Sequence, residues 1–190
     1  MTETTEPYAP SQRPRPLTAR DPRLAPWRAF LTAHALVSRR LDDDLRAEHR
    51  MTLAEYAALL QLAESPDRRL RMNQLADGIV LSRSGVTRLI DRLEADGLVA
   101  RKHCASDGRG AEAELTDQGL SRLRQASRTH LRGIEAYFLG TVQPVDLEAI
   151  ERSCAAIRQR VRDDGRADAG GPAESAATRS PEPPGEQPPA

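Results

Sequence analysis

The sequence predicts a mainly α-helical fold with one small β-hairpin. Apolar residues recur at a spacing near 3.6 through most of residues 25 to 165, which is the period of an amphipathic helix. Only residues 98 to 115 depart from it, with two short, partly alternating runs around a turn of Ser, Asp and Gly. A chain of 190 residues that is 38% hydrophobic has enough apolar side chains for one core, and with 3% aromatic residues that core is mostly aliphatic.

Both ends of the chain differ in composition from this central part. Six of the 14 prolines precede residue 27, and six follow residue 171. Segments rich in Pro, Ser, Gly and Glu cannot bury enough apolar surface to offset the entropy of ordering. We therefore expect a disordered Pro-rich tail at 1–24, a folded domain at 25–165, and a disordered acidic Pro-rich tail at 166–190.

Several classes of protein are excluded by what the sequence lacks. It has no apolar run of about 18 residues, which a membrane-spanning helix needs. Two cysteines cannot form the dense framework of a secreted disulfide scaffold. The first residues have neither the basic start nor the apolar stretch of an export signal. We expect a cytoplasmic protein without a membrane partner.

The first two helices follow from periodicity and capping. A long helix at 27–48 has one apolar face, made of Trp27, Phe30, Leu31, His34, Leu41 and Leu45. The spacing from Thr52 to Glu55 is that of a capping box, which predicts the start of a second helix. The apolar residues of this second helix are Tyr56, Leu59, Leu60 and Ala63. Ser65-Pro66-Asp67 ends it.

Two further helices and the hairpin come next. A short helix contains Met72, Leu75, Ala76 and Ile79. Ser82 caps a fourth helix, whose apolar face consists of Val86, Leu89, Ile90 and Leu93. Gly97 follows where a left-handed residue is favoured. Leu98–Lys102 and Ala111–Leu115 then predict a two-stranded hairpin.

Two helices complete the predicted domain. Thr116 caps a long helix, whose apolar residues are Leu120, Leu123, Leu131, Ile134 and Phe138. Asp146 caps the last helix, whose apolar residues are Leu147, Ile150, Cys154, Ile157 and Val161.

A pair of helices followed by a hairpin is the layout of a winged helix-turn-helix, whose second helix enters the major groove of DNA. The polar face of the fourth helix fits that role, because its side chains can reach phosphates and base edges; they are Arg83, Ser84, Thr87, Arg88 and Arg92.

The whole chain has a formal net charge of +0. Residues 68–110 nevertheless contain nine basic and five acidic residues, and residues 163–190 contain two basic and six acidic ones. The neutral total thus combines a basic segment and an acidic tail.

Three segments of this region match a known pattern. They are Leu75–Glu94 with Ser82-Arg83-Ser84-Gly85-Val86-Thr87-Arg88 at its centre, Gly97-Leu98-Val99-Ala100-Arg101, and Asp107-Gly108-Arg109 with Leu115-Thr116 behind it. Together they resemble the MarR family of transcriptional regulators, over about residues 25 to 162. The resemblance implies a winged helix-turn-helix at about 52–116. It also implies a homodimer that pairs through helices at about 27–48 and 117–162 and reads a near-palindromic operator in double-stranded DNA.

The resemblance also assigns residues to DNA. It implies that the start of the fourth helix faces the major groove, through Ser82, Arg83, Ser84, Thr87 and Arg88. Arg92 would contact a phosphate or a base edge, and Arg109 at the wing tip would enter the minor groove, where narrow A·T-rich DNA attracts a cation. Asp107 and Gly108 would support the wing, with Asp107 orienting a basic neighbour.

An effector site is implied as well. In MarR-like proteins a small aromatic or amphipathic molecule often binds between the dimerisation helices and the DNA-binding lobe, and here the candidate lining is Trp27, Phe30, His34, Tyr56 and His130. Plain core or dimer packing is the alternative explanation for these five residues. The histidines have no metal-ligand spacing and no cysteine cluster beside them, so we expect neither a metal nor a cofactor.

The expected function is a sequence-specific regulator of transcription, acting as a homodimeric repressor that a small molecule releases. We expect no enzyme, because the sequence has no Gly-rich phosphate loop and no nucleophile-and-base pattern.

One alternative function is that of a redox sensor, in which the basic neighbours of Cys104 make its thiolate reactive. The other cysteine, Cys154, is expected to be a small buried hydrophobe. The other alternative is a winged-helix module that binds protein and has little use for DNA.

Overall fold

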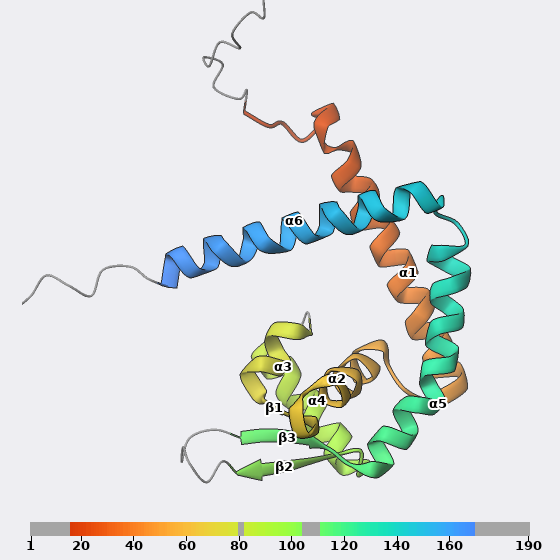
Figure 1. Ribbon diagram of the computed structural model, residues 1–190, viewed down its shortest axis with the longest axis vertical. Helices are drawn as coiled ribbons and strands as arrows, with labels where there is room; N and C mark the ends of the chain where they lie inside the picture. The colour runs from red at the N-terminus through yellow and green to blue at the C-terminus, as the bar shows by residue number, and fades with distance from the viewer. Residues whose placement is uncertain (1–15, 80–81, 104–110, 170–190) are drawn as a thin grey trace, which may run out of the picture. The chain divides into compact units, whose positions relative to one another are not determined.

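The computed structural model describes residues 16–79, 82–103 and 111–169 (Figure 1). The chain divides into two compact units, Met1–Thr141 and Val142–Ala190. The first unit contains η1 (Pro22–Leu24), α1 (Ala25–His49), α2 (Leu53–Glu64), η2 (Pro66–Arg68), β1 (Arg69–Arg71), α3 (Met72–Gly78), α4 (Arg83–Ala95), β2 (Val99–His103), β3 (Ala111–Leu115), α5 (Asp117–Ile134) and η3 (Glu135–Leu139). The predicted fold class, mainly helical with a small β wing, is confirmed. None of the described helices combines the length and apolar character that crossing a bilayer requires.

The N-terminal helices begin and end close to where the sequence places them. Thr52 forms the predicted capping box: its hydroxyl accepts from the Glu55 backbone N–H at 3.0 Å, and the Glu55 carboxylate accepts from the Thr52 backbone N–H at 2.8 Å. The face of α1 is buried only near its C-terminal end, at Leu41 and Leu45. The 3-10 turn η1 lies within the segment expected as a tail.

The sheet differs from the expected hairpin. It has three strands in the order β1-β3-β2, and both pairings are antiparallel. The predicted hairpin forms from β2 and β3, and Arg69–Arg71 adds an unexpected third strand along the other edge of β3. A three-residue strand with one apolar side chain leaves almost no alternation to detect, and its partner lies more than 40 residues away, with Arg69 opposite Glu114.

The start of α5 packs closely on the loop that follows α4. The Thr116 hydroxyl caps α5 by accepting from the Gly119 backbone N–H at 2.9 Å, and donates toward the Gly97 carbonyl at 2.8 Å. Gly97 has the predicted left-handed backbone, with φ of +70°. Gly119 is buried, and a Cβ there would lie 2.1 Å from the Leu98 carbonyl oxygen. Helix α5 can therefore pack this closely on the loop only with glycine at residue 119.

The far end of α5 changes geometry. The predicted single long helix ends at Ile134 and continues as the π-helical turn η3, which contains Phe138. From this turn the Tyr137 hydroxyl donates to Asp44 on α1 at 2.8 Å, and the Arg40 Nε donates to Tyr137 at 3.3 Å. Gly133 also meets α1, because a Cβ there would lie 2.5 Å from a Leu41 methyl group. Helices α1 and α5 consequently lie side by side (Figure 1).

The second unit contains α6 (Pro144–Ala169). The expectation that Asp146 caps this helix is wrong: Pro144 begins it, and the Gln143 carbonyl accepts from the Asp146 and Leu147 backbone N–H groups. Proline suits a first helical position, because its missing N–H would have no partner there. The helix continues to Ala169, beyond residue 165 where the expected domain ends.

One aliphatic core joins α2, α3, α4 and the sheet. Its fully buried large side chains are Leu45, Leu59, Leu62, Leu75, Val86, Leu89, Ile90 and Leu93. Half of these eight side chains come from α4, so one face of that helix is fixed against the core.

Replacing Gly119 by alanine should destabilise the domain, although alanine is the better helix former. The added methyl group would overlap the Leu98 carbonyl oxygen, and such overpacking costs about 1 to 3 kcal/mol in the free energy of unfolding. The matched control is Gly78→Ala, whose methyl group meets only the mobile amide end of Gln61 and should change stability by less than about 1 kcal/mol. Urea denaturation of both variants measures the difference; equal stabilities would contradict the close crossing.

Candidate nucleic-acid interface

Helix α4 has one buried and one exposed face. Val86, Leu89, Ile90 and Leu93 are at most 1% exposed. The opposite face is exposed, and it includes Ser84, Thr87, Arg88 and Arg92. The predicted recognition face is therefore the solvent face of this helix.

The first turn of α4 presents small polar groups. The Ser82 hydroxyl accepts from the Gly85 backbone N–H at 3.1 Å, and so forms the predicted N-cap. The Ser82 and Ser84 hydroxyls lie 3.1 Å apart. Arg83 begins the helix, but its side chain lies outside the described part of the chain. The helix N-terminus with these hydroxyls can bind an anion such as a DNA phosphate.

Arg88 stands out among the charged residues of this face. It is exposed, and it makes no ion pair with any described residue. An arginine without an internal partner keeps all five guanidinium N–H donors for a ligand. Of the predicted contacts whose side chains are described, Arg88 is the one that offers an uncompensated charge.

Arg92 behaves differently. Its Nε donates to the Glu55 carboxylate of α2 at 3.2 Å. The Arg92 side chain is 58% exposed, whereas that of Glu55 is 14% exposed. The sequence did not indicate this pair, because the two residues are 37 positions apart and Glu55 already had a local role in the capping box.

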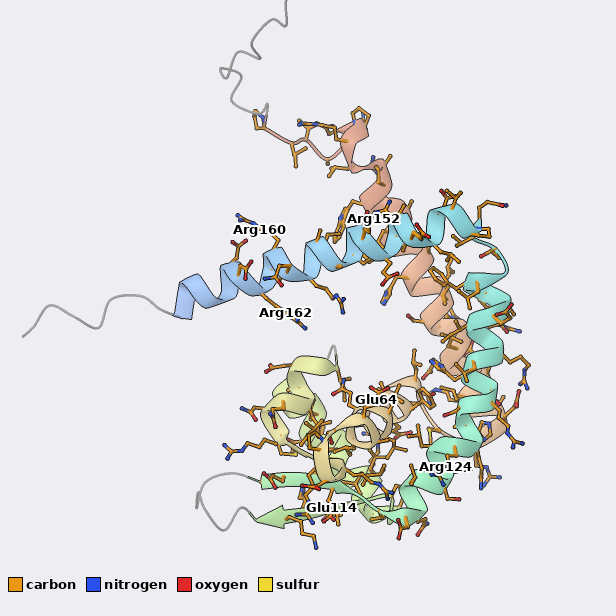
Figure 2. The ribbon with its side chains drawn as sticks, viewed as in Figure 1. Glu64, Glu114, Arg124, Arg152, Arg160 and Arg162 are labelled. Atoms are coloured by element: carbon orange, nitrogen blue, oxygen red, sulfur yellow. The ribbon has the colours of Figure 1, made fainter. Side chains whose placement is uncertain are left out.

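Most other cations of the basic segment are also paired. Arg101 on β2 contacts Asp91 and Glu94, which ties the base of the wing to α4. Arg69, Arg71 and Lys102 pair with Glu112 and Glu114 of β3, which are not in the predicted basic segment. Figure 2 labels Glu114 on this strand. A charge count over 68–110 therefore overstates the positive field, since the partners lie beyond its ends.

The charge on Glu114 follows from its neighbours. A hydrogen bond from Arg69 at 3.0 Å, together with the nearby Lys102 ammonium, lowers the pKa of the Glu114 carboxyl below its usual value. The carboxylate therefore stays ionised and holds β1 and β2 on either side of β3.

The wing tip lies outside the described residues. Asp107, Gly108 and Arg109 belong to it, as does Cys104. Strands β2 and β3 are antiparallel, with Val99 opposite Leu115 and His103 opposite Ala111. The predicted contacts of the tip remain predictions.

The five candidate effector residues form two separate sets of ring contacts. Trp27, Phe30 and His34 stack along α1, with centroid separations of 6.1 and 6.2 Å. Trp27 and Phe30 are 54% and 50% exposed. Tyr56 is buried and packs on His130 at 4.3 Å, and its hydroxyl donates to Ser127. Two surface hollows of about 600 and 560 Å³ are lined by none of these five residues.

His130 is held in an apolar setting. Burial against Tyr56 lowers the pKa of the imidazole below its usual value. Its Nδ1 is buried and has no hydrogen-bond partner in the described part of the chain. Protonation at that atom would place a charge where no acceptor meets it.

Comparisons with known proteins agree with this geometry. A model of the MarR family matches residues 50–110. The chain is 34% identical over 82 residues to the transcriptional repressor YetL of Bacillus subtilis, a match that covers 43% of this chain and only about half, 49%, of YetL. It is 31% identical to the regulator YkoM of the same organism, over 60% of this chain and 72% of YkoM.

Solved structures are similar over a larger part of the chain. A MarR family transcriptional regulator from Streptomyces coelicolor, solved in complex with DNA, is 33% identical with a TM-score of 0.69, over 78% of this chain and 92% of that one. The regulator AbsC from the same organism is 32% identical with the same TM-score, over 78% of this chain and 99% of AbsC.

Lowering the pH should destabilise the fold through His130. The pKa of His130 is lower in the folded than in the unfolded state. At pH values between these two pKa values the unfolded state binds more protons, so the free energy of unfolding falls as the pH drops below about 6.5. His130→Gln should remove this part of the pH dependence. Urea unfolding at pH 7.5 and pH 5 measures it, with His34→Gln as the control on an exposed histidine. An unchanged dependence in His130→Gln would show that His130 is not the responsible group.

Proposed function

The chain belongs to the MarR family of transcriptional regulators, and on that premise we propose that it binds DNA sequence-specifically through α4. The observation that carries the proposal is the exposed face of α4, where Arg88 has no ion-pair partner among the described residues. Ser82, Arg83, Ser84 and Thr87 complete the set that contacts the major groove. Because the opposite face is locked in the core, this is the face of α4 that can meet DNA.

The wing supplies a second contact in this proposal. Arg109 enters the adjacent minor groove, and Asp107 and Gly108 shape the turn that carries it. The ion pairs of Arg101 with α4 support it, since they connect the base of the wing to the recognition helix. Groove contacts from two elements would then fix the angle at which α4 meets the duplex.

We propose that the functional form is a homodimer on a near-palindromic operator. Exposed apolar side chains support it on both terminal helices: Trp27, Phe30, Leu31 and Leu36 on α1, and Val145, Ile150, Ile157 and Val161 on α6. Apolar surface of this extent usually marks an interface. Twofold symmetry would place two copies of α4 about 34 to 36 Å apart, one turn of DNA.

The proposed mode of regulation is repression in the cytoplasm, relieved by a small aromatic or amphipathic molecule. The similarity to YetL, which is named a repressor, supports the sign of regulation. The ring contacts of Trp27, Phe30 and His34, and of Tyr56 with His130, are the surfaces that such a molecule would use. An effector that prefers a dimer with displaced recognition helices weakens DNA binding by linkage.

Fluorescence anisotropy tests the function directly. The full chain is titrated into a labelled duplex from upstream of its own gene and into a scrambled duplex, at two salt concentrations. Tighter binding to the upstream duplex, falling steeply with salt, is the expected result, since phosphate contacts release counterions. Weak and equal binding to both duplexes would favour a protein-interaction module. The redox alternative would be favoured if peroxide treatment weakens DNA binding by the wild-type chain but not by the Cys104→Ser variant.

Arg88→Ala should weaken binding to the preferred duplex by about 1 to 3 kcal/mol, the size of a good base contact, and leave the fold intact. The matched control is Arg128→Ala, which removes an exposed arginine on α5 that also lacks an ion pair with any described residue. Equal losses in both variants would mean that Arg88 acts only through overall charge.

A further inference from the structure

The carboxylate of Glu55 makes two contacts at once. One oxygen, Oε2, accepts from the Thr52 backbone N–H at 2.8 Å and closes the capping box of α2. The other, Oε1, accepts from the Arg92 Nε at 3.2 Å. Because the first bond fixes the carboxylate against the start of α2, the second fixes Arg92 relative to that helix.

The geometry at Arg92 leaves its outer donors available. Glu55 engages Nε, and Arg92 makes no other ion pair within the described part of the chain. The two terminal nitrogens, Nη1 and Nη2, carry four of the five N–H donors of the guanidinium. The side chain is 58% exposed and lies on the same solvent face of α4 as Arg88.

We propose that Glu55 is a positioning residue for DNA recognition: it holds Arg92 by Nε so that Nη1 and Nη2 donate to a phosphate of the operator. This rests on the proposed function. A phosphate contact carries no sequence information itself, but it sets the register and orientation of the protein on the duplex. A preoriented guanidinium loses less side-chain freedom when it binds than a free one. Glu55 therefore improves discrimination between sequences through Arg92.

A purely electrostatic role for Glu55 makes the opposite prediction. A carboxylate near DNA repels every duplex alike, so its removal would strengthen binding to all sequences by one factor. A positioning role instead changes the ratio of the two dissociation constants, for a non-preferred and a preferred duplex, and does so only while Arg92 is present. That ratio separates the two roles.

The test uses the full chain and a duplex selected by it from a random library, compared with a scrambled duplex. Glu55→Gln removes the charge but keeps a capping residue suited to the third helical position. Arg92→Gln and the double variant complete a mutant cycle. Glu64→Gln is the matched control, since it removes an exposed carboxylate from the same helix α2 (Figure 2).

Glu55→Gln is expected to lower the discrimination ratio about threefold to tenfold. Arg92→Gln should lower it at least as far, the double variant no further than Arg92→Gln alone, and Glu64→Gln not at all. Urea denaturation of each variant checks that the fold is retained. An unchanged ratio in Glu55→Gln, or additive losses in the double variant, would overturn the positioning role. A wild-type chain that fails to prefer its selected duplex would instead refute the proposed function itself.

Discussion

The burial of α4 through Val86, Leu89, Ile90 and Leu93 is the constraint on which the candidate interface depends. Fully burying one such side chain contributes about 1.5 to 3 kcal/mol, so rotating the helix by a single residue would expose a large part of the core. With the inner face fixed, the helical period decides which side chains face solvent. Arg88 and Arg92 therefore face solvent, because the aliphatic residues of α4 occupy the core.

The same arrangement explains how a chain with a formal net charge of +0 can present a binding face for an anion. The cations of the sheet are balanced by Glu112 and Glu114, and Arg101 is balanced by Asp91 and Glu94. These pairs are partly exposed, so each contributes modest stability, but together they neutralise the charge at the base of the wing. Among the α4 side chains that the structure describes, the uncompensated charge is local, at Arg88, on the solvent face of the helix.

Sequence alone predicts the features that arise within a few residues of one another. The caps at Thr52, Ser82 and Thr116 all form as expected, since a hydroxyl and a backbone N–H three residues away need only a local turn. Strand β1 and the pair of Arg92 with Glu55 could not be predicted, because their partners are 37 or more residues away and nothing in the local pattern marks them. The expected start of α6, after a cap at Asp146, is three residues later than the observed start at Pro144, because proline and aspartate are both common at the beginning of a helix. The sequence predicts which residues form the exposed face of α4, but it does not predict which arginine on that face has an ion-pair partner.

Glu55 shows how a locally predicted residue gains a long-range role. The N-terminus of α2 is bonded on its other side to α1, where one oxygen of Asp42 accepts from the Leu53 backbone N–H at 2.7 Å and the other accepts from Arg46 at 2.6 Å. Successive polar contacts thus run from α1 through the start of α2 to Arg92 on α4. Of these bonds, the one between Asp42 and Leu53 crosses from α1 to α2, and the one between Glu55 and Arg92 crosses from α2 to α4. The same end of α2 is therefore bonded both to α1 and, through Glu55, to Arg92 on α4.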